Sequence, residues 1–483
     1  MELVNSLGED RLWVDSLCTV QDDAELKHHQ ISHMAIIYSG ALVTLVAAGA
    51  RDANSSIPGV RAGTRWLREK QKVPELNCPL RPDLVFKAID RTVYVSRAWT
   101  FQERHLSRRC LYFLDEQVYF QCRKELWCEE PSPLALARFN LGSPLGFGLN
   151  LMPRAQAWAE DIRRKDYDRG FAFYAEIIQE YSWKSLSYPK DIMNAFAGIL
   201  NALETHSSWN ITYGMLEELI DWTLLWVPLG VQQRRPSPQS GSLLHFPSWS
   251  WIGWIGPITF NLAFNNFALA PLQSLIEDID VDLRSLRRKI VGKSGNVWIP
   301  VSESKLADHP LPTPSMFPSI LRFTIEIINT TNFEIEEMPH WRWNPTEYSD
   351  KGTSSEQTGI FITRNGKVTG LLLGTSAKFA PFRNWSHLRL VAISEARQSV
   401  SGIYSSILLP GEMENMARQS WTDYQQLAYK HEAHRFDYPT GYFMYNVMVI
   451  QRRGDYYERV AVGQMNRLSW KAGIPVKETI LLV

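Results

Sequence analysis

The sequence contains no long apolar run. A membrane-spanning helix needs roughly 18 or more consecutive apolar residues. The longest apolar stretch near the start, residues 36–50, is interrupted by Ser39, Gly40 and Thr44. The N-terminal residues also lack a basic segment followed by an apolar run, so no secretory signal is expected. We therefore predict a protein that does not insert into a membrane.

Cysteine is scarce, with five residues in 483, and neither sign of charge is in excess. A sparse, odd set of cysteines in a long chain is typical of reduced thiols, which favours a cytoplasmic location. Lys+Arg and Asp+Glu each number 51, whereas a protein that coats nucleic acid needs clustered positive charge. No nucleic-acid partner is therefore expected.

Several common catalytic and metal-binding motifs are also missing. The sequence has no G-x-S-x-G, no H-E-x-x-H and no paired C-x-x-C. His29 and His33 stand four residues apart on a predicted helix, a spacing at which two imidazoles can share a metal ion. No third ligand is evident nearby, and the adjacent His28 indicates a polar outer face. We therefore predict a solvated histidine face, no metal site and no cofactor.

Tryptophan is abundant, with 18 residues. Its side chain buries a large area but needs a partner for its N–H group. One interpretation is a set of aromatic cores. The other is a ligand surface, for example a carbohydrate-stacking platform of Trp249, Trp251 and Trp254, which requires these side chains to be exposed. Burial is the usual fate of aromatic side chains, so we favour the cores.

Apolar periodicity predicts an α/β unit at the start of the chain. A helix ends at Gly8, residues 11–17 alternate as in a strand, and residues 24–39 carry the stripe of an amphipathic helix. Residues 41–48 follow as a buried type of strand, and this strand–helix–strand order is typical of a parallel sheet. Further along, we expect a helix over 98–106, a hairpin over 110–114 and 117–122, and helices over 167–181, 189–203 and 213–226.

The remaining chain changes character after Phe246. Short β-type runs predominate there, at 249–254, 320–328, 359–362, 388–393, 443–450 and 459–463, and 338–357 resembles an exposed loop. These patterns predict four regions: an α/β domain over 1–130, a linker over 131–165, a helical region over 166–245, and a mixed, β-rich, Trp-containing region over 246–483.

The first segment with candidate site residues runs from Leu12 to Asp23. Open α/β sheets bind ligands at the carboxyl ends of their strands, so Asp15, Gln21 and Asp22 are candidate ligand-binding residues. The alternative is structural: Asp22 or Asp23 caps the next helix, and Asp15 accepts hydrogen bonds from loop amides. For Asp22 and Asp23 the structural interpretation is favoured, and for Asp15 the two are balanced.

The second segment runs from Arg97 to Arg104. On a helix, Trp99 and Glu103 share one face, four residues apart. An indole offers a π face and a carboxylate offers negative charge, a combination suited to a cationic or aromatic ligand. The alternative is a core tryptophan, with Glu103 paired to Arg97, Arg104 or Arg108. Spacing alone favours this alternative.

Three blocks of the sequence, in order, resemble the heterokaryon incompatibility (HET) domain of filamentous fungi. That family carries a block similar to LWIDSLCIIQDD, then a helix of the form M-x-x-IY-x-x-A, then R-x-WTLQE followed by LS-x-R and a short strand. This chain has LWVDSLCTVQDD at 12–23, MAIIYSGA at 34–41, and RAWTFQE at 97–103, followed by LSRR at 106–109. The runs PSWSWIGW at 247–254 and YNVM at 445–448 also resemble segments downstream of HET domains.

The resemblance implies a fold and a chemistry. HET domains are thought to be relatives of the Toll/interleukin receptor (TIR) domain, whose sheet is parallel and flavodoxin-like, and some TIR domains cleave NAD at the nicotinamide glycosidic bond. Their catalytic glutamate lies four residues after a tryptophan. By this resemblance Glu103 would stabilise an oxocarbenium-like transition state, Trp99 would wall the pocket, Asp15 would lie at its edge, and NAD would be a substrate.

The chain departs from the family pattern at its start. HET domains usually begin with a strand block similar to Y-x-ALSYVWG, tens of residues before the LWID block, whereas here only one helix precedes Trp13. We therefore expect an N-terminally truncated, partial TIR-like sheet with flanking helices. In a TIR-like sheet, the loop after this first strand borders the nucleotide pocket. Its absence therefore predicts impaired NAD glycohydrolase chemistry.

Two functions follow from the sequence. The first is self/non-self recognition or programmed cell-death signalling of the HET type, with vestigial TIR-like NAD glycohydrolase chemistry. The alternative is a non-catalytic interaction or oligomerisation module, in which the α/β part self-associates or binds a protein partner. If Glu103 and Asp15 lie far apart, the alternative is favoured.

Overall fold

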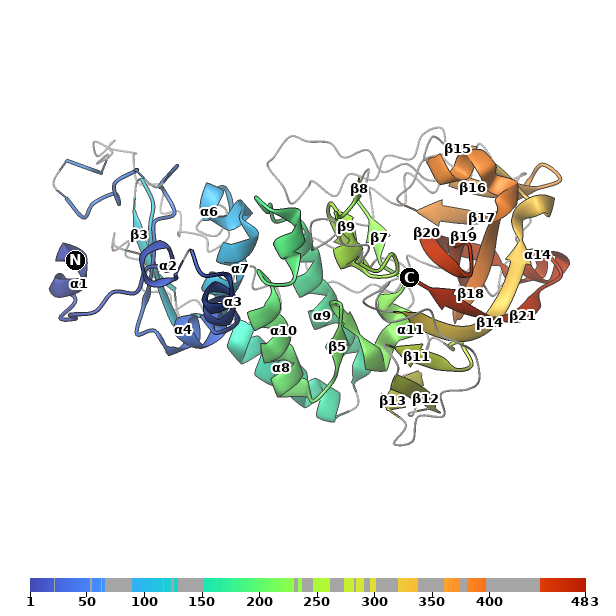
Figure 1. Ribbon diagram of the computed structural model, residues 1–483, viewed down its shortest axis with the longest axis horizontal. Coiled ribbons are helices and arrows are strands. Elements are labelled where there is room, and N and C mark those ends of the chain that lie inside the picture. Colours follow the sequence, from blue (N-terminus) through green and yellow to red (C-terminus); the bar gives the residue numbers. More distant parts are fainter. Residues whose placement is uncertain are drawn as a thin grey trace, which may run out of the picture. The chain divides into compact units, whose positions relative to one another are not determined.

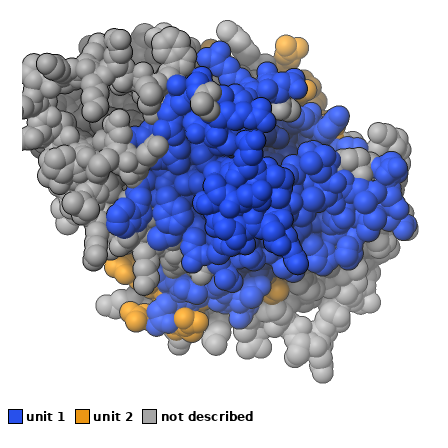
Figure 2. Space-filling view, turned by 90° about the vertical axis from the view of Figure 1, so that its left-hand side faces the viewer, with its two compact units in different colours: residues 1–160, 183–208 blue, residues 161–182, 209–483 orange. Residues whose placement is uncertain are grey.

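The computed structural model describes residues 1–20, 22–52, 54–61, 63–65, 89–115, 117–122, 126–128, 151–164, 166–229, 233–236, 246–260, 273–281, 284–290, 296–300, 320–337, 360–373, 380–396 and 444–483 (Figure 1). The chain forms two compact units. Unit 1 comprises residues 1–160 and 183–208, and unit 2 comprises residues 161–182 and 209–483 (Figure 2).

Unit 1 is built from short helices and strands. In chain order, they are α1 (Glu2–Ser6), α2 (Asp15–Cys18), α3 (Ala24–Ser32), α4 (Met34–Gly40), β1 (Thr44–Val46), α6 (Val93–Ser96), α7 (Ala98–Leu106), β2 (Arg109–Phe113), β3 (Val118–Cys122), β4 (Leu126–Cys128), η1 (Pro189–Ile192) and α10 (Ala197–Ser207). Helix α8 (Leu151–Arg163) begins in unit 1 and ends in unit 2.

The sheet of unit 1 has the strand order β1-β2-β3-β4. Strand β1 pairs with β2 in parallel, Leu45 opposite Leu111, whereas β2–β3 and β3–β4 are antiparallel. The core behind it consists of the buried side chains of Val46, Ala48, Ile89, Val95, Cys110, Tyr112 and Tyr119. Unit 1 is thus mixed α/β, and of the expected parallel sheet the described residues contain one parallel pair.

The predicted strand over residues 11–17 is wrong. Residues 11–14 pair with no strand in the described chain, and the segment then turns into helix α2. Its backbone bonds are helical, with Cys18 N–H donating to the Val14 carbonyl at 2.7 Å. Leu12 and Leu17 remain exposed, at 43% and 82%. The alternation is real, but a strand needs a neighbouring strand to satisfy its backbone groups, and none lies beside it.

The helix predicted over 24–39 is present as two helices, α3 and α4. Asp23 caps the first, because its carboxylate accepts the Leu26 N–H at 2.9 Å, as the structural interpretation of that residue predicted. His33 separates the two helices. The strand expected over 41–48 is shorter, with only Thr44–Val46 paired.

Helix α7 lies against α4 and α10 in unit 1. A Cβ atom at Gly198 would lie 2.8 Å from a Leu106 methyl and 2.9 Å from the Ala35 methyl, so this close approach of helices requires glycine. The Gly198 N–H also donates to the Gln102 side chain at 3.3 Å. This packing holds α7 against α4 and α10.

The helix predicted over 98–106 and the hairpin predicted over 110–122 are confirmed. Helix α7 spans the predicted residues 98–106, and β2 and β3 form the predicted antiparallel hairpin. Helix α9 (Tyr167–Ser182), in unit 2, confirms the prediction over 167–181. The helix predicted over 189–203 divides into η1 and α10.

Unit 2 is dominated by β structure. Besides α9, it contains β5 (Ile211–Thr212), β6 (Met215–Leu216), η2 (Glu217–Leu219), α11 (Ile220–Thr223), β7 (Val227–Pro228), β8 (Gln233–Arg234), η3 (Trp251–Gly253), β9 (Trp254–Ile255), β10 (Ile258–Thr259), β11 (Ile279–Val281), β12 (Arg284–Ile290), β13 (Asn296–Pro300), β14 (Leu321–Asn329), η4 (Thr330–Asn332), β15 (Glu334–Glu337), β16 (Ile360–Arg364), β17 (Lys367–Leu373), η6 (Ala380–His387), β18 (Leu388–Ala396), β19 (Met444–Arg453), β20 (Tyr456–Asn466), α14 (Arg467–Ala472) and β21 (Val476–Leu482).

The large sheet of unit 2 runs β13-β12-β11-β14-β18-β19-β20-β17-β16-β15, and β21 pairs with both β14 and β20. Strands β14, β18, β19, β20 and β21 therefore pair in a closed ring. One buried cluster of this unit includes Ile328, Leu390, Val447, Val449 and Trp470. The strands predicted at 320–328, 359–362, 388–393, 443–450 and 459–463 correspond to β14, β16, β18, β19 and β20, with ends that differ by a few residues.

Two other predictions for unit 2 are wrong. The helix predicted over 213–226 begins instead with a two-residue hairpin, in which Tyr213 and Gly214 have φ of 49° and 73°. Such positive φ values are those of a type I′ turn, which reverses the chain. The strand predicted at 249–254 is mostly the 3₁₀ turn η3, with the Ser250 hydroxyl accepting the Ile252 N–H.

The tryptophans of segment 247–254 are buried. Trp249, Trp251 and Trp254 are 0%, 2% and 8% exposed. The indole N–H of Trp251 donates to the Gly214 carbonyl at 3.1 Å, and that of Trp254 donates to the Ser248 carbonyl at 2.9 Å. A stacking platform needs exposed rings, so the carbohydrate hypothesis is wrong here and the core interpretation holds.

No helix among the described residues is both long and apolar enough to cross a membrane. Most of the predicted linker over 131–165 and the predicted loop over 338–357 lie outside the described residues, although the chain is helical in α8 from Leu151.

Candidate functional site

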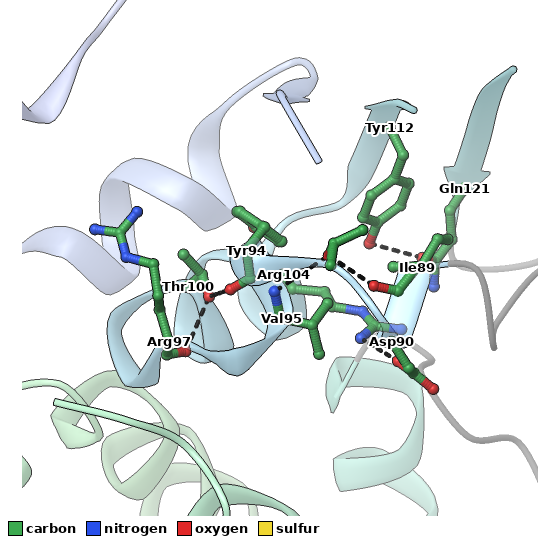
Figure 3. Close-up of polar contacts among 10 residues, drawn as sticks. Ile89, Asp90, Tyr94, Val95, Arg97, Thr100, Arg104, Tyr112 and Gln121 are labelled. Carbon is green, nitrogen blue, oxygen red and sulfur yellow. Dashed lines mark hydrogen bonds and ion pairs between the residues drawn. The ribbon is translucent and has the colours of Figure 1, made fainter. Parts of the chain in front are cut away.

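The candidate site is held by the connection between α6 and α7. The Thr92 hydroxyl caps α6 by accepting the Val95 N–H, and donates to the Ile89 carbonyl at 2.7 Å. The Thr100 hydroxyl contacts the carbonyl oxygens of Tyr94 and Arg97, 2.9 Å away for Arg97 (Figure 3). These bonds fix where α7 begins, and with it the direction of the side chains that follow.

An ion pair fixes the direction of the buried Arg104 side chain on α7. The Arg104 guanidinium, 3% exposed, lies 3.3 Å from the Asp90 carboxylate (Figure 3). On the sheet, the Tyr112 hydroxyl donates to the Gln121 side chain at 3.0 Å. Arg104 therefore turns towards Asp90, and the preceding residue, Glu103, points to a different side of α7.

Glu103 is partly exposed, yet its carboxylate is closely surrounded by protein. Burial and, after it, the nearby negative charge of Asp15 raise the pKa of Glu103 from 4.5 to about 7. The Arg97 guanidinium and the hydroxyls of Tyr38 and Tyr94 oppose this shift. The negative charge of the Glu103 carboxylate is therefore poorly solvated.

Two tyrosines lie against this carboxylate. The hydroxyl of Tyr38, on α4, hydrogen-bonds to Glu103, and burial together with Glu103 and Asp15 raises the pKa of Tyr38. Burial and Glu103 likewise raise the pKa of Tyr94. The Tyr94 hydroxyl makes no hydrogen bond of standard geometry within the described chain. Both phenols therefore remain protonated donors beside an acid.

The structure brings Asp15 and Glu103 together. Their charges interact directly, although Asp15 lies at the start of α2 and not at the tip of a strand. The exposed Asp15 carboxylate also accepts the Ser16 N–H at 2.7 Å, as the structural interpretation expected of a loop amide. Asp15 therefore both orders its own turn and contributes negative charge to the site.

The other ligand-binding candidates are less informative. Asp22 is exposed in the turn before α3, and Gln21 lies outside the described residues. Trp99 is half-buried on α7, one turn before Glu103, and makes no ring contact within the described chain. Neither Arg104 nor Arg108 pairs with Glu103 there, and Arg97 acts on it only through its charge.

No cluster of three or more metal-ligating side chains occurs in the described part of the chain. His29 lies on α3 and His33 directly follows this helix. Both are exposed, with their rings 4.3 Å apart and His33 Nδ1 2.7 Å from the His29 carbonyl. Cys18, Cys110 and Cys122 are free thiols.

Three residues of this cluster were not among the site candidates from sequence. Tyr38 had appeared only as part of the apolar stripe on the predicted helix, although it stands in the second of the three similar blocks. Arg97 was considered only as an ion-pair partner. Tyr94 carried no signal, because its position against Glu103 depends on the turn between α6 and α7.

The comparisons with known proteins agree with the blocks seen in the sequence. Residues 1–103 match the family model of the heterokaryon incompatibility protein (HET), and this match covers both Asp15 and Glu103. No curated protein and no solved structure gives a match. At the level of the family, the match supports a heterokaryon incompatibility-type function. Residues 1–103 of this chain are therefore similar to the HET domain.

Proposed function

We propose that this protein is a cytoplasmic recognition or cell-death signalling protein of the incompatibility type, whose HET domain hydrolyses NAD. The proposed reaction breaks the bond between the nicotinamide nitrogen and C1′ of the ribose. Nicotinamide leaves with the bonding electrons, water adds to C1′, and one proton is released. The products are nicotinamide and ADP-ribose.

One observation supports this chemistry above others: the charge of the Glu103 carboxylate is destabilised by its surroundings. Glu103 is poorly solvated and lies near the second negative charge of Asp15. As the glycosidic bond breaks, the ribose ring gains positive charge, which an ionised carboxylate stabilises. In a site that solvates it poorly, the same carboxylate gains more from this positive charge than it would in water.

The remaining neighbours suit the same substrate. Exposed Arg97 lies beside the acids, and its guanidinium is suited to bind phosphate oxygens of the dinucleotide. Trp99 presents a half-buried indole one turn before Glu103, suited to stacking on the nicotinamide. The parallel pair β1–β2, with helices beside it, is compatible with part of a TIR-like sheet.

A non-catalytic role in self-association or in binding a protein partner is the second candidate. It is favoured by exposed apolar side chains on and near the short helices of unit 1: Leu17 is 82% exposed, Ile36 66% and Leu42 55%. Exposed apolar groups of this kind are common at protein interfaces.

The two candidates differ in one measurement. Purified full-length protein is incubated with NAD, and nicotinamide release is followed for the wild type, Glu103→Ala and the control Glu9→Ala. Glu9 is exposed in the same unit. We expect Glu103→Ala to lose at least about a hundredfold in kcat, the scale of a lost electrostatic stabiliser, and Glu9→Ala to match the wild type. Equal turnover by all three proteins would contradict the catalytic role, and no turnover by the wild type would favour the interaction module.

A further inference from the structure

Tyr38 contacts both the helix that carries Glu103 and the segment that carries Asp15. It is buried, at 8% exposure, on α4. Its hydroxyl hydrogen-bonds to the Glu103 carboxylate on α7. Its ring meets the indole of Trp13 edge-on, with 5.7 Å between centroids and an interplanar angle of 82°. Trp13 stands two residues before Asp15, so one tyrosine contacts the segments that carry both acids.

The two contacts act on different atoms. A T-shaped aromatic pair fixes the plane of the Tyr38 ring, because the positive edge of one ring faces the negative face of the other. With its ring fixed, the hydroxyl has one direction in which to donate. A charge-assisted hydrogen bond to one carboxylate oxygen is strong and directional.

We propose that Tyr38 is a positioning residue, which holds the Glu103 carboxylate in one orientation and couples it, through Trp13, to the segment that carries Asp15. This assignment rests on the proposed function for its catalytic consequence, but its structural part stands without it. Tyr38 does not touch the substrate. It acts by restricting the rotation of Glu103 and by partly stabilising its ionised form.

Tyr94 shows why the assignment falls on Tyr38. Its hydroxyl also lies against the Glu103 carboxylate. Its main-chain carbonyl is bound by Thr100 of α7, so Tyr94 is tied to the α6–α7 turn that leads directly into the helix of Glu103. Tyr38, in contrast, comes from α4 and links Glu103 to a segment far from it in sequence.

The test uses Tyr38→Phe, which keeps the ring that packs on Trp13 and removes only the hydroxyl. The first readout is the titration of the Glu103 carboxyl group by infrared difference spectroscopy, assigned by the band missing from Glu103→Gln. Losing a hydrogen bond to the ionised form should move the titration midpoint upward by about one pH unit. The second readout is NAD turnover, where we expect kcat to fall about tenfold and KM to stay within about twofold.

Tyr188→Phe is the matched control, because Tyr188 is 66% exposed in the same unit and loses the same hydroxyl. It should leave both readouts unchanged. Trp13→Leu removes the edge contact without removing a hydrogen bond, and should move the midpoint upward by less than Tyr38→Phe does. An unchanged Glu103 midpoint in Tyr38→Phe overturns the assignment, as does an unchanged kcat in an active protein. If the wild type does not turn over NAD, the proposed function fails, and the titration alone decides the role of Tyr38.

Discussion

The two units of this protein differ in how the surroundings of a buried charged side chain interact with its charge. In unit 2, Arg459 is 3% exposed, and its guanidinium lies 3.6 Å from the centroid of the Trp226 ring. It donates to the main-chain carbonyls of Leu224, at 2.7 Å, and of Trp226. In unit 1, Glu103 is crowded by protein and has another carboxylate, Asp15, as a neighbour. The surroundings of Arg459 accept its hydrogen bonds, whereas the charge of Asp15 repels that of Glu103.

The two units also differ in the length of their strands and in their exposed apolar side chains. Unit 2 contains strands of ten and eleven residues, β19 and β20, which pair along their whole length. No described strand of unit 1 exceeds five residues. All large exposed apolar side chains of the described chain belong to unit 1, except Leu468, Ile474 and Val476. Unit 2 therefore resembles a stable platform, while unit 1 carries groups whose interactions are incomplete. Incomplete interactions of this kind are characteristic of ligand sites.

The largest effect on stability is expected from Arg459→Met. The substitution removes two hydrogen bonds to buried carbonyls and the contact with Trp226, so the free energy of unfolding of unit 2 should fall by about 3 kcal/mol. Denaturant titration followed by tryptophan fluorescence measures this. The control is Arg452→Met, since Arg452 is exposed on the neighbouring strand β19. Equal losses for the two variants would remove the distinction between matched and surface arginines.

A smaller effect of opposite sign is expected from Glu103→Gln. Because the pKa of Glu103 is raised from 4.5 to about 7 in the folded protein, folding takes up a proton between these values, and stability falls as the pH rises through this window. Glutamine imitates the neutral acid. The variant should be more stable than the wild type by about 1–3 kcal/mol at pH 8, and close to it at pH 5.

Thermal unfolding at these two pH values, with Asp15→Asn alongside, checks this prediction. Removing the Asp15 charge relieves only one of the causes of the shift, so Asp15→Asn should stabilise the protein at pH 8 by less than Glu103→Gln does. A difference between Glu103→Gln and the wild type that is the same at both pH values would contradict a raised pKa.

The smallest effect is expected at the exposed apolar residues of unit 1. Leu17→Ser and Ile36→Ser replace side chains that are 82% and 66% exposed, so each should change the free energy of unfolding by less than about 0.5 kcal/mol. Ile328→Ser in the unit 2 core serves as the contrast, because that residue is 1% exposed and should be strongly destabilising. A loss of more than about 1 kcal/mol for either surface variant would mean that this surface is covered in the isolated protein.

The elements that the sequence predicted well are those set by local periodicity. Helix α7 has the predicted ends, and the β2–β3 hairpin has the predicted turn. Strand β14 shows the same agreement, since its burial alternates along the chain. Strands β18 and β19 instead contain continuous apolar runs that are buried on both faces.

The failures come from partners distant in sequence. Alternation at residues 11–17 resembled a strand, but no neighbouring strand pairs with it in the described chain. The 213–226 segment had helical spacing, but the positive φ values of Tyr213 and Gly214 place a hairpin turn at its start. The spacing of apolar residues predicts neither outcome.

Some features of the candidate site could likewise be predicted from the sequence, and others depend on the fold. Trp99 and Glu103 follow from helical spacing, whereas Asp15 was predicted at the end of a strand and instead lies at the start of helix α2. The raised pKa of Glu103 and the contact of Tyr38 with both Trp13 and Glu103 depend on the folding of α2, α4 and α7 against one another. Sequence could name the acids, but their proximity and their burial are tertiary properties.

The most direct test of the account is the pH dependence of nicotinamide release from NAD by the full-length protein between pH 5 and pH 9. Since the ionised carboxylate is the form that stabilises positive charge, kcat/KM should rise with pH through an apparent pKa of about 7, that of Glu103. Glu103→Gln should show a low rate without this rise. A rate that is independent of pH across this range, or one that rises equally in Glu103→Gln, would contradict the claim that the destabilised charge of Glu103 drives the chemistry.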